Sequence, residues 1–163
     1  MYRLSFILLI VALSFFTYSC QKKVKVETEE YSIKLPSQAN FINNNIDTLD
    51  QEQNLFAVIV FRKNKTDYLS IDDCLSSELP FMLEGKNSYN VVSFSTSIDG
   101  KKALISRGVN ILKNRKIFWL VAVVQTKYYY YIIRVISGKN TFKFNELQME
   151  KIANSFHLKS NEI

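Results

Sequence analysis

Residues 117–125 read IFWLVAVVQ, and the prediction of the fold starts from them. Branched and aromatic side chains of this kind favour a β-strand. In a strand, Ile117, Trp119, Val121 and Val123 point to one face, and the residues between them point to the other. Both sets are apolar. The pattern therefore predicts a strand inside a sheet that is covered on both sides.

Turn sequences on either side of this stretch extend it into a four-strand antiparallel meander. The predicted strands span residues 89–98, 101–112, 117–125 and 128–137. Asp99-Gly100 between the first two is a strong signal for a two-residue hairpin. The segments at 113–116 and 126–127 supply the other two turns.

Helical spacing of apolar residues predicts a helix before the meander and another after it. Ser70 is the expected cap of the first helix, and Pro80 predicts a kink or an early stop. Its apolar stripe comprises Ile71, Cys74, Leu75, Leu79, Met82 and Leu83. Asn145 is the expected cap of the second helix. Its stripe comprises Met149, Ile152, Ala153 and Phe156.

Two earlier segments also have strand patterns. Residues 31–35 alternate apolar with polar before Pro36, and residues 55–62 are apolar on both faces. Residues 40–53 are rich in Asn, Asp and Gln and are predicted to be mostly loop. Together the elements predict one α+β domain over residues 31–160, a mostly antiparallel sheet sandwiched between helices.

The first residues of the chain have the three parts of a signal peptide. Arg3 is the basic part, residues 6–16 are almost entirely apolar, and Ser19-Cys20 follows as a small residue before a cysteine. This arrangement predicts a bacterial lipoprotein precursor with a signal peptide over residues 1–19, cut before Cys20. The Cys20 thiol would then carry the lipid, and two or three acyl chains suffice for a stable membrane anchor.

Two alternatives to lipidation are open. A transmembrane anchor needs about 20 apolar residues, and this apolar stretch is shorter. Ordinary secretion would need a small-x-small cleavage site, which the sequence before Cys20 fits poorly. Gln21 is not the aspartate associated with inner-membrane retention, so we expect the outer membrane. Which face of that membrane carries the domain stays open.

Charge and cysteine content narrow the setting further. Removing residues 1–19 lowers the formal charge from +6 to +5 and leaves 144 residues, enough for one domain. Basic residues are scattered through predicted loops, which indicates solvated turns rather than a patch for anionic lipid or an acidic partner. Nucleic acid is not an expected partner of an exported protein. The basic groups are Arg62, Lys63 and Lys65; Lys101 and Lys102; and Lys113, Arg115 and Lys116.

With Cys20 lipidated, Cys74 has no disulfide partner in the chain, and we interpret it as a small buried apolar residue. A reactive thiol is the alternative. Residues 20–30 are predicted to be the lipidated cysteine and a flexible, charged tether to the domain. The Lys/Val alternation in this segment allows an edge strand instead.

The sequence offers no convincing catalytic, cofactor or metal site. The lone His157 is expected at a helix end or on the surface, and nothing in its spacing supports a Ser/His/Asp triad. Asp72, Asp73 and Glu78 are the nearest metal-ligand candidates. A solvent-exposed helix face, stabilised by the helix dipole, explains the presence of these acidic residues better than a metal site does. We therefore expect neither an enzyme nor a bound metal or cofactor.

Tyr128, Tyr129, Tyr130 and Tyr131 form the one unusual run. A strand would place two of these rings on each face. They are the candidate ligand or partner face, together with Trp119 on the neighbouring strand, because tyrosine offers a large contact area with a polar tip. The alternative is that these residues are simply good strand formers.

The order of elements resembles the PsbP-like fold, shared by a thylakoid subunit of photosystem II and a nuclear protein that binds the Ran GTPase. The resemblance covers residues 31–158. It depends on the strand ending at Pro36, the helix before the meander, residues 98–103 (IDGKKA) and the closing residues 153–158 (ANSFHL). It is a resemblance of pattern without a signature motif. It implies a binding or assembly module and assigns no functional residue.

Three functions remain as hypotheses. The first is a lipid-anchored, non-enzymatic module that binds another envelope protein. The second is a carrier or sensor for a small apolar or aromatic ligand held against the Tyr/Trp face. The third, an enzyme, has no reactive cluster in the sequence to support it.

Overall fold

The computed structural model describes residues 23–36, 40–41, 56–83, 88–112, 115–138 and 146–159. The predicted signal peptide, the expected lipidation site Cys20 and the expected helix cap Asn145 lie outside these residues. Most of the loop predicted at 40–53 also lies outside them.

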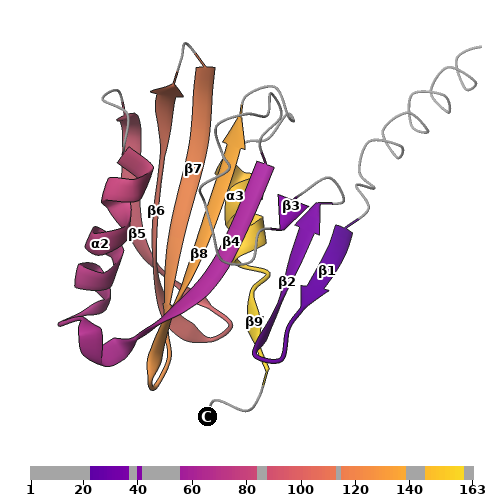
Figure 1. Ribbon diagram of the computed structural model, residues 1–163, viewed down its shortest axis with the longest axis vertical. Coiled ribbons are helices and arrows are strands. Elements are labelled where there is room, and N and C mark those ends of the chain that lie inside the picture. The colour runs from indigo at the N-terminus through magenta and orange to yellow at the C-terminus, as the bar shows by residue number, and fades with distance from the viewer. Residues whose placement is uncertain are drawn as a thin grey trace, which may run out of the picture.

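A large sheet forms the centre of the domain, with the strand order β3-β4-β8-β7-β6-β5 (Figure 1). Its strands are β3 (Asn40–Phe41), β4 (Phe56–Asn64), β5 (Ser88–Ile98), β6 (Lys101–Leu112), β7 (Arg115–Gln125) and β8 (Tyr129–Gly138). β3 runs parallel to β4, and every other neighbouring pair is antiparallel. β5 to β8 are neighbours in space in the order of the chain, so the predicted meander is confirmed.

The hairpin between β5 and β6 turns where the sequence predicted. Asp99 and Gly100 have φ angles of 51° and 70°. Two successive left-handed residues belong to a type I′ turn, whose twist matches that of the strands it joins. The turn therefore fixes the register in which Ile98 faces Lys101.

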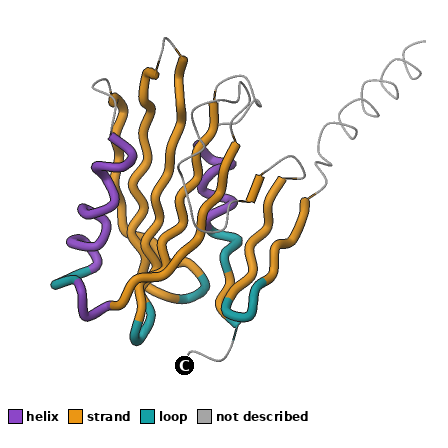
Figure 2. Tube along the Cα trace, viewed as in Figure 1, coloured by secondary structure: helices purple, strands orange, loops and turns teal. Residues whose placement is uncertain are grey.

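Helices cover both faces of the sheet, as Figures 1 and 2 show, and the α+β class is confirmed. α2 (Ile71–Leu83) packs on β6 and β7 on one face, and α3 (Glu146–Ala153) packs on β7 and β8 on the other. The two faces of β7 divide as predicted: Trp119, Val121 and Val123 lie under α2, whereas Leu120, Ala122 and Val124 lie with α3. The predicted stripe of α3 is buried throughout.

α2 begins as predicted but does not end early. The Ser70 hydroxyl accepts the backbone N–H of Asp73 at 3.1 Å and so caps the helix. Pro80 lies inside the helix, which continues to Leu83, so of the two expectations the early stop is wrong, and the kink stays a prediction. Packing of Met82, which is 5% exposed, accounts for the extra turn, because its burial offsets the hydrogen bond that proline cannot make.

A second, smaller sheet packs beside α3 and corrects the predicted tether. It has the order β1-β2-β9, with β1 (Lys23–Glu27), β2 (Tyr31–Pro36) and β9 (His157–Leu158). Residues 23–27 are thus an edge strand of the folded domain, which extends N-terminal of the predicted boundary at residue 31. Figure 1 shows this sheet to one side of the large one.

The alternation in β1 explains why this segment is ordered. Val26 packs against the main core, and its Cα partner on β2 is the fully buried Ile33. The Thr28 hydroxyl accepts the N–H of Tyr31 at 3.0 Å and closes the turn between the two strands. Apolar pairing on one face and a closed turn outweigh the charged composition of the segment.

Candidate functional site

The predicted Tyr/Trp face is divided between the two sides of the sheet and is largely buried. Trp119 and Tyr130 are 1% and 2% exposed and lie beneath α2. The Trp119 indole N–H donates to Asn110 Oδ1 at 2.9 Å, and Tyr130 meets the ring of Tyr68 edge-on with centroids 6.1 Å apart. These two rings fill the core beneath the helix and present no surface to a ligand.

The other tyrosines of the run lie elsewhere. Tyr131 is fully buried on the α3 side, where its ring packs against Tyr31 and Phe156. Tyr129 is half-buried on the same side. Tyr128 precedes β8 and is 58% exposed. The five candidate residues therefore do not form a common site, and the strand-former interpretation explains four of them.

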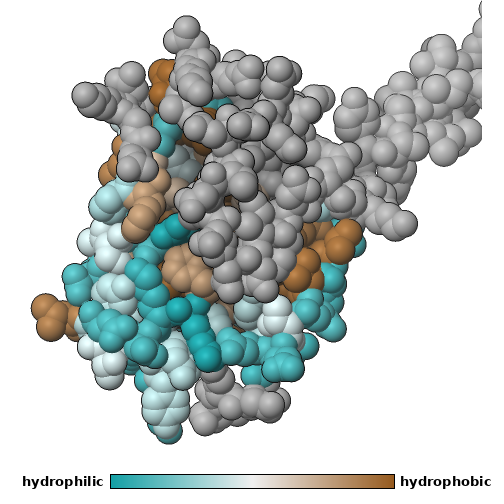
Figure 3. Space-filling view, viewed as in Figure 1, coloured by the Kyte–Doolittle hydropathy of each residue, from teal (hydrophilic) through white to brown (hydrophobic). Residues whose placement is uncertain are grey.

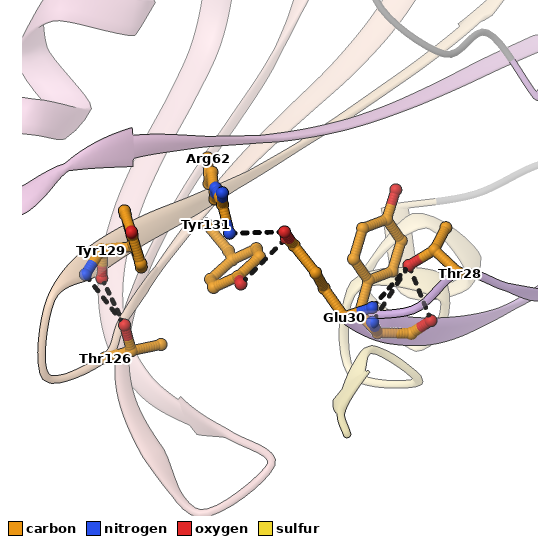
Figure 4. A network of polar contacts seen from close by, with 7 residues as sticks. Thr28, Glu30, Arg62, Thr126, Tyr129 and Tyr131 are labelled. Atoms are coloured by element: carbon orange, nitrogen blue, oxygen red, sulfur yellow. Dashed lines mark hydrogen bonds and ion pairs between the residues drawn. The ribbon is translucent and has the colours of Figure 1, made fainter. Parts of the chain in front are cut away.

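A polar network joins the small sheet to the large one at this end of β8 (Figure 4). The Arg62 guanidinium on β4 binds Glu30 Oε1 and lies 4.5 Å from the centre of the Tyr129 ring. The Tyr131 hydroxyl donates to Glu30 Oε2 at 3.2 Å. Glu30 thus receives a cation and a hydroxyl from the large sheet, which holds the β1–β2 turn against it.

A buried ion cluster lies under α2, and the sequence did not predict it. Glu78 is fully buried, whereas we expected it on an exposed helix face with Asp72 and Asp73. Its carboxylate binds the Arg134 guanidinium, with Nε 2.9 Å from Oε2, and the Lys63 ammonium, 2.5 Å from Oε1. Burial acts to lower the pKa of Lys63, but the interactions with Glu78 and Tyr68 together outweigh burial and raise the pKa.

Aromatic rings complete this cluster. The Arg134 guanidinium lies between the rings of Phe61 and Phe81, 4.9 Å from the centre of each. Aromatic rings at this distance attract a cation electrostatically. The Glu78 carboxylate thus carries one cation against each of its two oxygens. The arrangement therefore fixes the position of α2 on β4 and β8.

Two predicted loop residues belong to these networks. Arg62 and Lys63 lie within β4, so the prediction that they are solvated turn residues is wrong. Alternation places them on opposite faces of the strand, where each meets a glutamate distant in the chain. A signal was present in the sequence, since both follow directly on an apolar strand pattern, but their partners could not be identified from it.

Cys74 has the character of a structural residue. Its side chain is fully buried and unpaired with another cysteine among the described residues. Burial raises the pKa of the thiol to about 11. The thiolate is the nucleophilic form, so the folded protein holds this cysteine in its unreactive state at neutral pH.

His157 lies on the surface in β9, beside the β5–β6 turn. Its Nδ1 is 2.5 Å from Asp99 Oδ1, and Asp99 Oδ2 accepts the N–H of Leu158 at 2.9 Å. This contact attaches the small sheet to the turn. Within the described parts of the chain, no group of three His, Cys, Asp or Glu side chains is placed to hold a metal ion.

The outer edge of β5 is the feature most suited to binding. Its eleven residues, SYNVVSFSTSI, contain no charged residue and no proline. Among the described residues, no strand pairs with that edge. Asn90, with a φ of 56°, and the register shift between Tyr89 and Val92 mark a bulge near the start of the strand. Beyond the bulge the strand is regular as far as Ile98.

The other sheet edges differ from β5 in charge or cover. β1, at the edge of the small sheet, contains Lys23, Lys25 and Glu27 in five residues. β4 contains Arg62 and Lys63 and is paired at one end with β3. Charges of this kind are the usual protection of a sheet edge against pairing with another chain. The β5 edge lacks that protection, and Val91 and Val92 on it are 45% and 46% exposed.

Exposed apolar surface elsewhere is dispersed. In the face shown in Figure 3, hydrophilic residues cover much of the lower part of the domain, and hydrophobic atoms occur in small separate groups. Leu69, in the bend before α2, is 99% exposed, and Leu147, on α3, is 62% exposed. No helix in the described part of the chain is long and apolar enough to cross a membrane.

Comparison with known proteins identifies no family. No protein-family model matches the chain. No curated protein matches it either. Among solved structures, the chain is similar to PA94 from Pseudomonas aeruginosa, a protein of unknown function, with a TM-score of 0.45 and 8% identity over 79% of this chain and 92% of that one. Resemblance to the PsbP-like fold stays a prediction.

Proposed function

We propose that this chain is a lipid-anchored, non-enzymatic binding module of the bacterial cell envelope that takes up an extended segment of a partner protein along β5. The observation that carries the proposal is the β5 edge, which is eleven residues long and uncharged. Strand addition to such an edge uses main-chain hydrogen bonds for affinity and alternate side chains for specificity.

The side chains of β5 indicate what kind of partner segment fits its edge. On the α3 side of β5, Val92 and Phe94 alternate with Ser93 and Ser95 on the α2 side. A partner strand therefore meets apolar side chains on one face and hydroxyls on the other. An uncharged segment with small polar and apolar residues in alternation matches this surface, because no charge on β5 compensates one on the partner.

The proposed location at the membrane rests on the sequence before the domain. Arg3, the apolar run at 6–16 and Ser19-Cys20 support cleavage before Cys20 and lipidation of its thiol. Gln21 favours the outer membrane. Since β1 begins at Lys23, the module would be held close to the lipid surface rather than on a ten-residue tether.

In-cell cross-linking tests the binding edge. The full chain and two variants are cross-linked in the cells that produce it, purified in detergent, and analysed for co-purifying proteins by mass spectrometry. Ser95→Lys/Thr96→Lys places a charge on each face of β5. Ser76→Lys/Asn154→Lys makes the same charge change at exposed positions on α2 and just after α3.

A partner recovered with wild type and the control, and reduced at least tenfold with the β5 variant, is the expected result. Equal recovery with all three chains would place the contact elsewhere and reject the edge. Recovery of no reproducible partner with wild type would reject the binding module itself. A fourth chain, Cys20→Ala, separates the anchor from the edge, because it should lose membrane attachment without altering β5.

A further inference from the structure

The outward face of the small sheet is rich in lysine. In β1, Val24 and Val26 alternate with Lys23, Lys25 and Glu27, and Val26 packs on the core. The three charged residues therefore point away from the domain. Lys25 and Glu27 form an exposed ion pair, and this pair lowers the pKa of Glu27.

β2 adds a third lysine to this face. Lys34 is exposed and is the direct Cα partner of Lys25 across the β1–β2 ladder. Like charges directly opposite one another in a sheet are destabilising. Within the described residues, neither Lys23 nor Lys34 has an acidic ion-pair partner. We name Lys23, Lys25 and Lys34 the lysine face.

The lysine face lies directly beside the proposed anchor. Only Gln21 and Lys22 separate Cys20 from the start of β1. Three residue steps of extended chain span at most about 10 Å, which is close to one Debye length at physiological salt. Val26 on the inner face of β1 packs on the core, whereas Val24 on that face is 48% exposed, and all three charged residues of β1 lie on the outward face.

We propose that the lysine face docks on anionic phospholipid head groups, so that the module lies on the membrane in a defined orientation. This inference rests on the proposed lipid anchor at Cys20. Each lysine near an anionic surface strengthens attachment about fivefold. The lysine face and the outer edge of β5 are separate surfaces on different sheets, although the end of β5 meets the small sheet where Asp99 contacts His157 and Leu158 of β9.

Lysine acetylation in vesicles tests the proposal. The processed full chain, purified from membranes, is reconstituted into vesicles of phosphatidylcholine alone or with about one third phosphatidylglycerol, a fraction that gives a strongly negative surface. After brief treatment with an acetylating reagent, peptide mass spectrometry gives the labelling of each lysine. Lys102 and Lys127, both exposed beyond the small sheet, are the internal controls.

Labelling of the lysine face should fall at least fivefold in anionic vesicles relative to neutral ones, with the two control lysines unchanged. The protection should disappear in 1 M salt, where the Debye length is about 3 Å. Lys34→Gln should reduce the protection of Lys23 and Lys25, whereas Lys102→Gln should leave it intact.

Equal labelling of the lysine face in the two kinds of vesicle would overturn the docking proposal while leaving the anchor in place. This holds whether both kinds protect the lysines or neither does, since head-group charge would then play no part. A chain that is washed off both kinds of vesicle would overturn the anchor, and with it this inference, because an unlipidated Cys20 cannot hold the face at the surface.

Discussion

Replacing Gly108 by alanine tests how tightly the sheet is fitted beneath α2. Gly108 on β6 is the direct cross-strand partner of Trp119 on β7. A Cβ atom at position 108 would lie 2.6 Å from Trp119 Cζ2 and 3.0 Å from Cε2. Carbon atoms in contact are normally 3.5–4.0 Å apart, so the overlap is about 1 Å.

The surroundings give the size of the effect. Trp119 is 1% exposed, and its indole N–H is held by Asn110, so the ring cannot move aside freely. Overpacking of a core costs about 1–3 kcal/mol. Loss of the indole hydrogen bond adds about 1 kcal/mol. We therefore expect Gly108→Ala to lower the free energy of unfolding by roughly 2–4 kcal/mol.

Urea denaturation followed by far-ultraviolet circular dichroism measures this effect without depending on tryptophan fluorescence. The matched experiment repeats Gly108→Ala in a Trp119→Phe background, where the smaller ring leaves space for the new methyl group. There the cost should fall below about 1 kcal/mol, which gives a coupling energy above 1 kcal/mol. A cost under about 0.5 kcal/mol in wild type, or equal costs in both backgrounds, would refute the packing argument.

Three further predictions concern the buried polar groups. Glu78→Ala leaves the Arg134 charge buried without its main partner and should lower the free energy of unfolding by about 3–5 kcal/mol in urea denaturation. The double variant Glu78→Leu/Arg134→Met should lose much less stability. Similar losses in both variants would argue against the ion cluster. The pKa of Cys74 is raised by burial to about 11, so its contribution to stability is present below pH ~8.5 and lost as the pH rises towards 11. Cys74→Ala should therefore flatten stability measured over that window, and an unchanged slope would count against burial of the thiol. Tyr131→Phe removes the hydroxyl bond to Glu30 and should cost about 1 kcal/mol, and no measurable loss of stability would show that the network does not hold the small sheet.

The central part of the fold was predictable because local signals there agree with one another. Asp99-Gly100 specifies its own turn, and the alternation in residues 117–125 gives both faces of β7 without reference to any other segment. The stripe of α3 is equally local. Each of these predictions needed only neighbouring residues, and each is confirmed.

The predictions differ from the structure at residues whose environment depends on partners distant in the chain. Glu78 is buried because Arg134, 56 positions away, and Lys63 neutralise it, and neither partner follows from the helix sequence. β1 is ordered because Ile33 faces Val26. Pro80 is accommodated because Met82 is buried beyond it.

The candidate site was less predictable than the fold. The tyrosine run attracts attention in the sequence, yet the sheet distributes it over two faces and fills the core with most of it. The β5 sequence gives no such signal, because its composition is ordinary and its importance depends on its place at the edge of the sheet. Position of that kind follows from topology, which no single segment contains.

The intact mass and the thiol count of the chain purified from membranes test lipidation at Cys20. We expect a chain that begins at Cys20, carries a diacylglyceryl group and a further acyl chain, and has one titratable thiol in denaturant, that of Cys74. A chain that retains residues 1–19, or that is cut elsewhere and shows thiols at both Cys20 and Cys74, would contradict it.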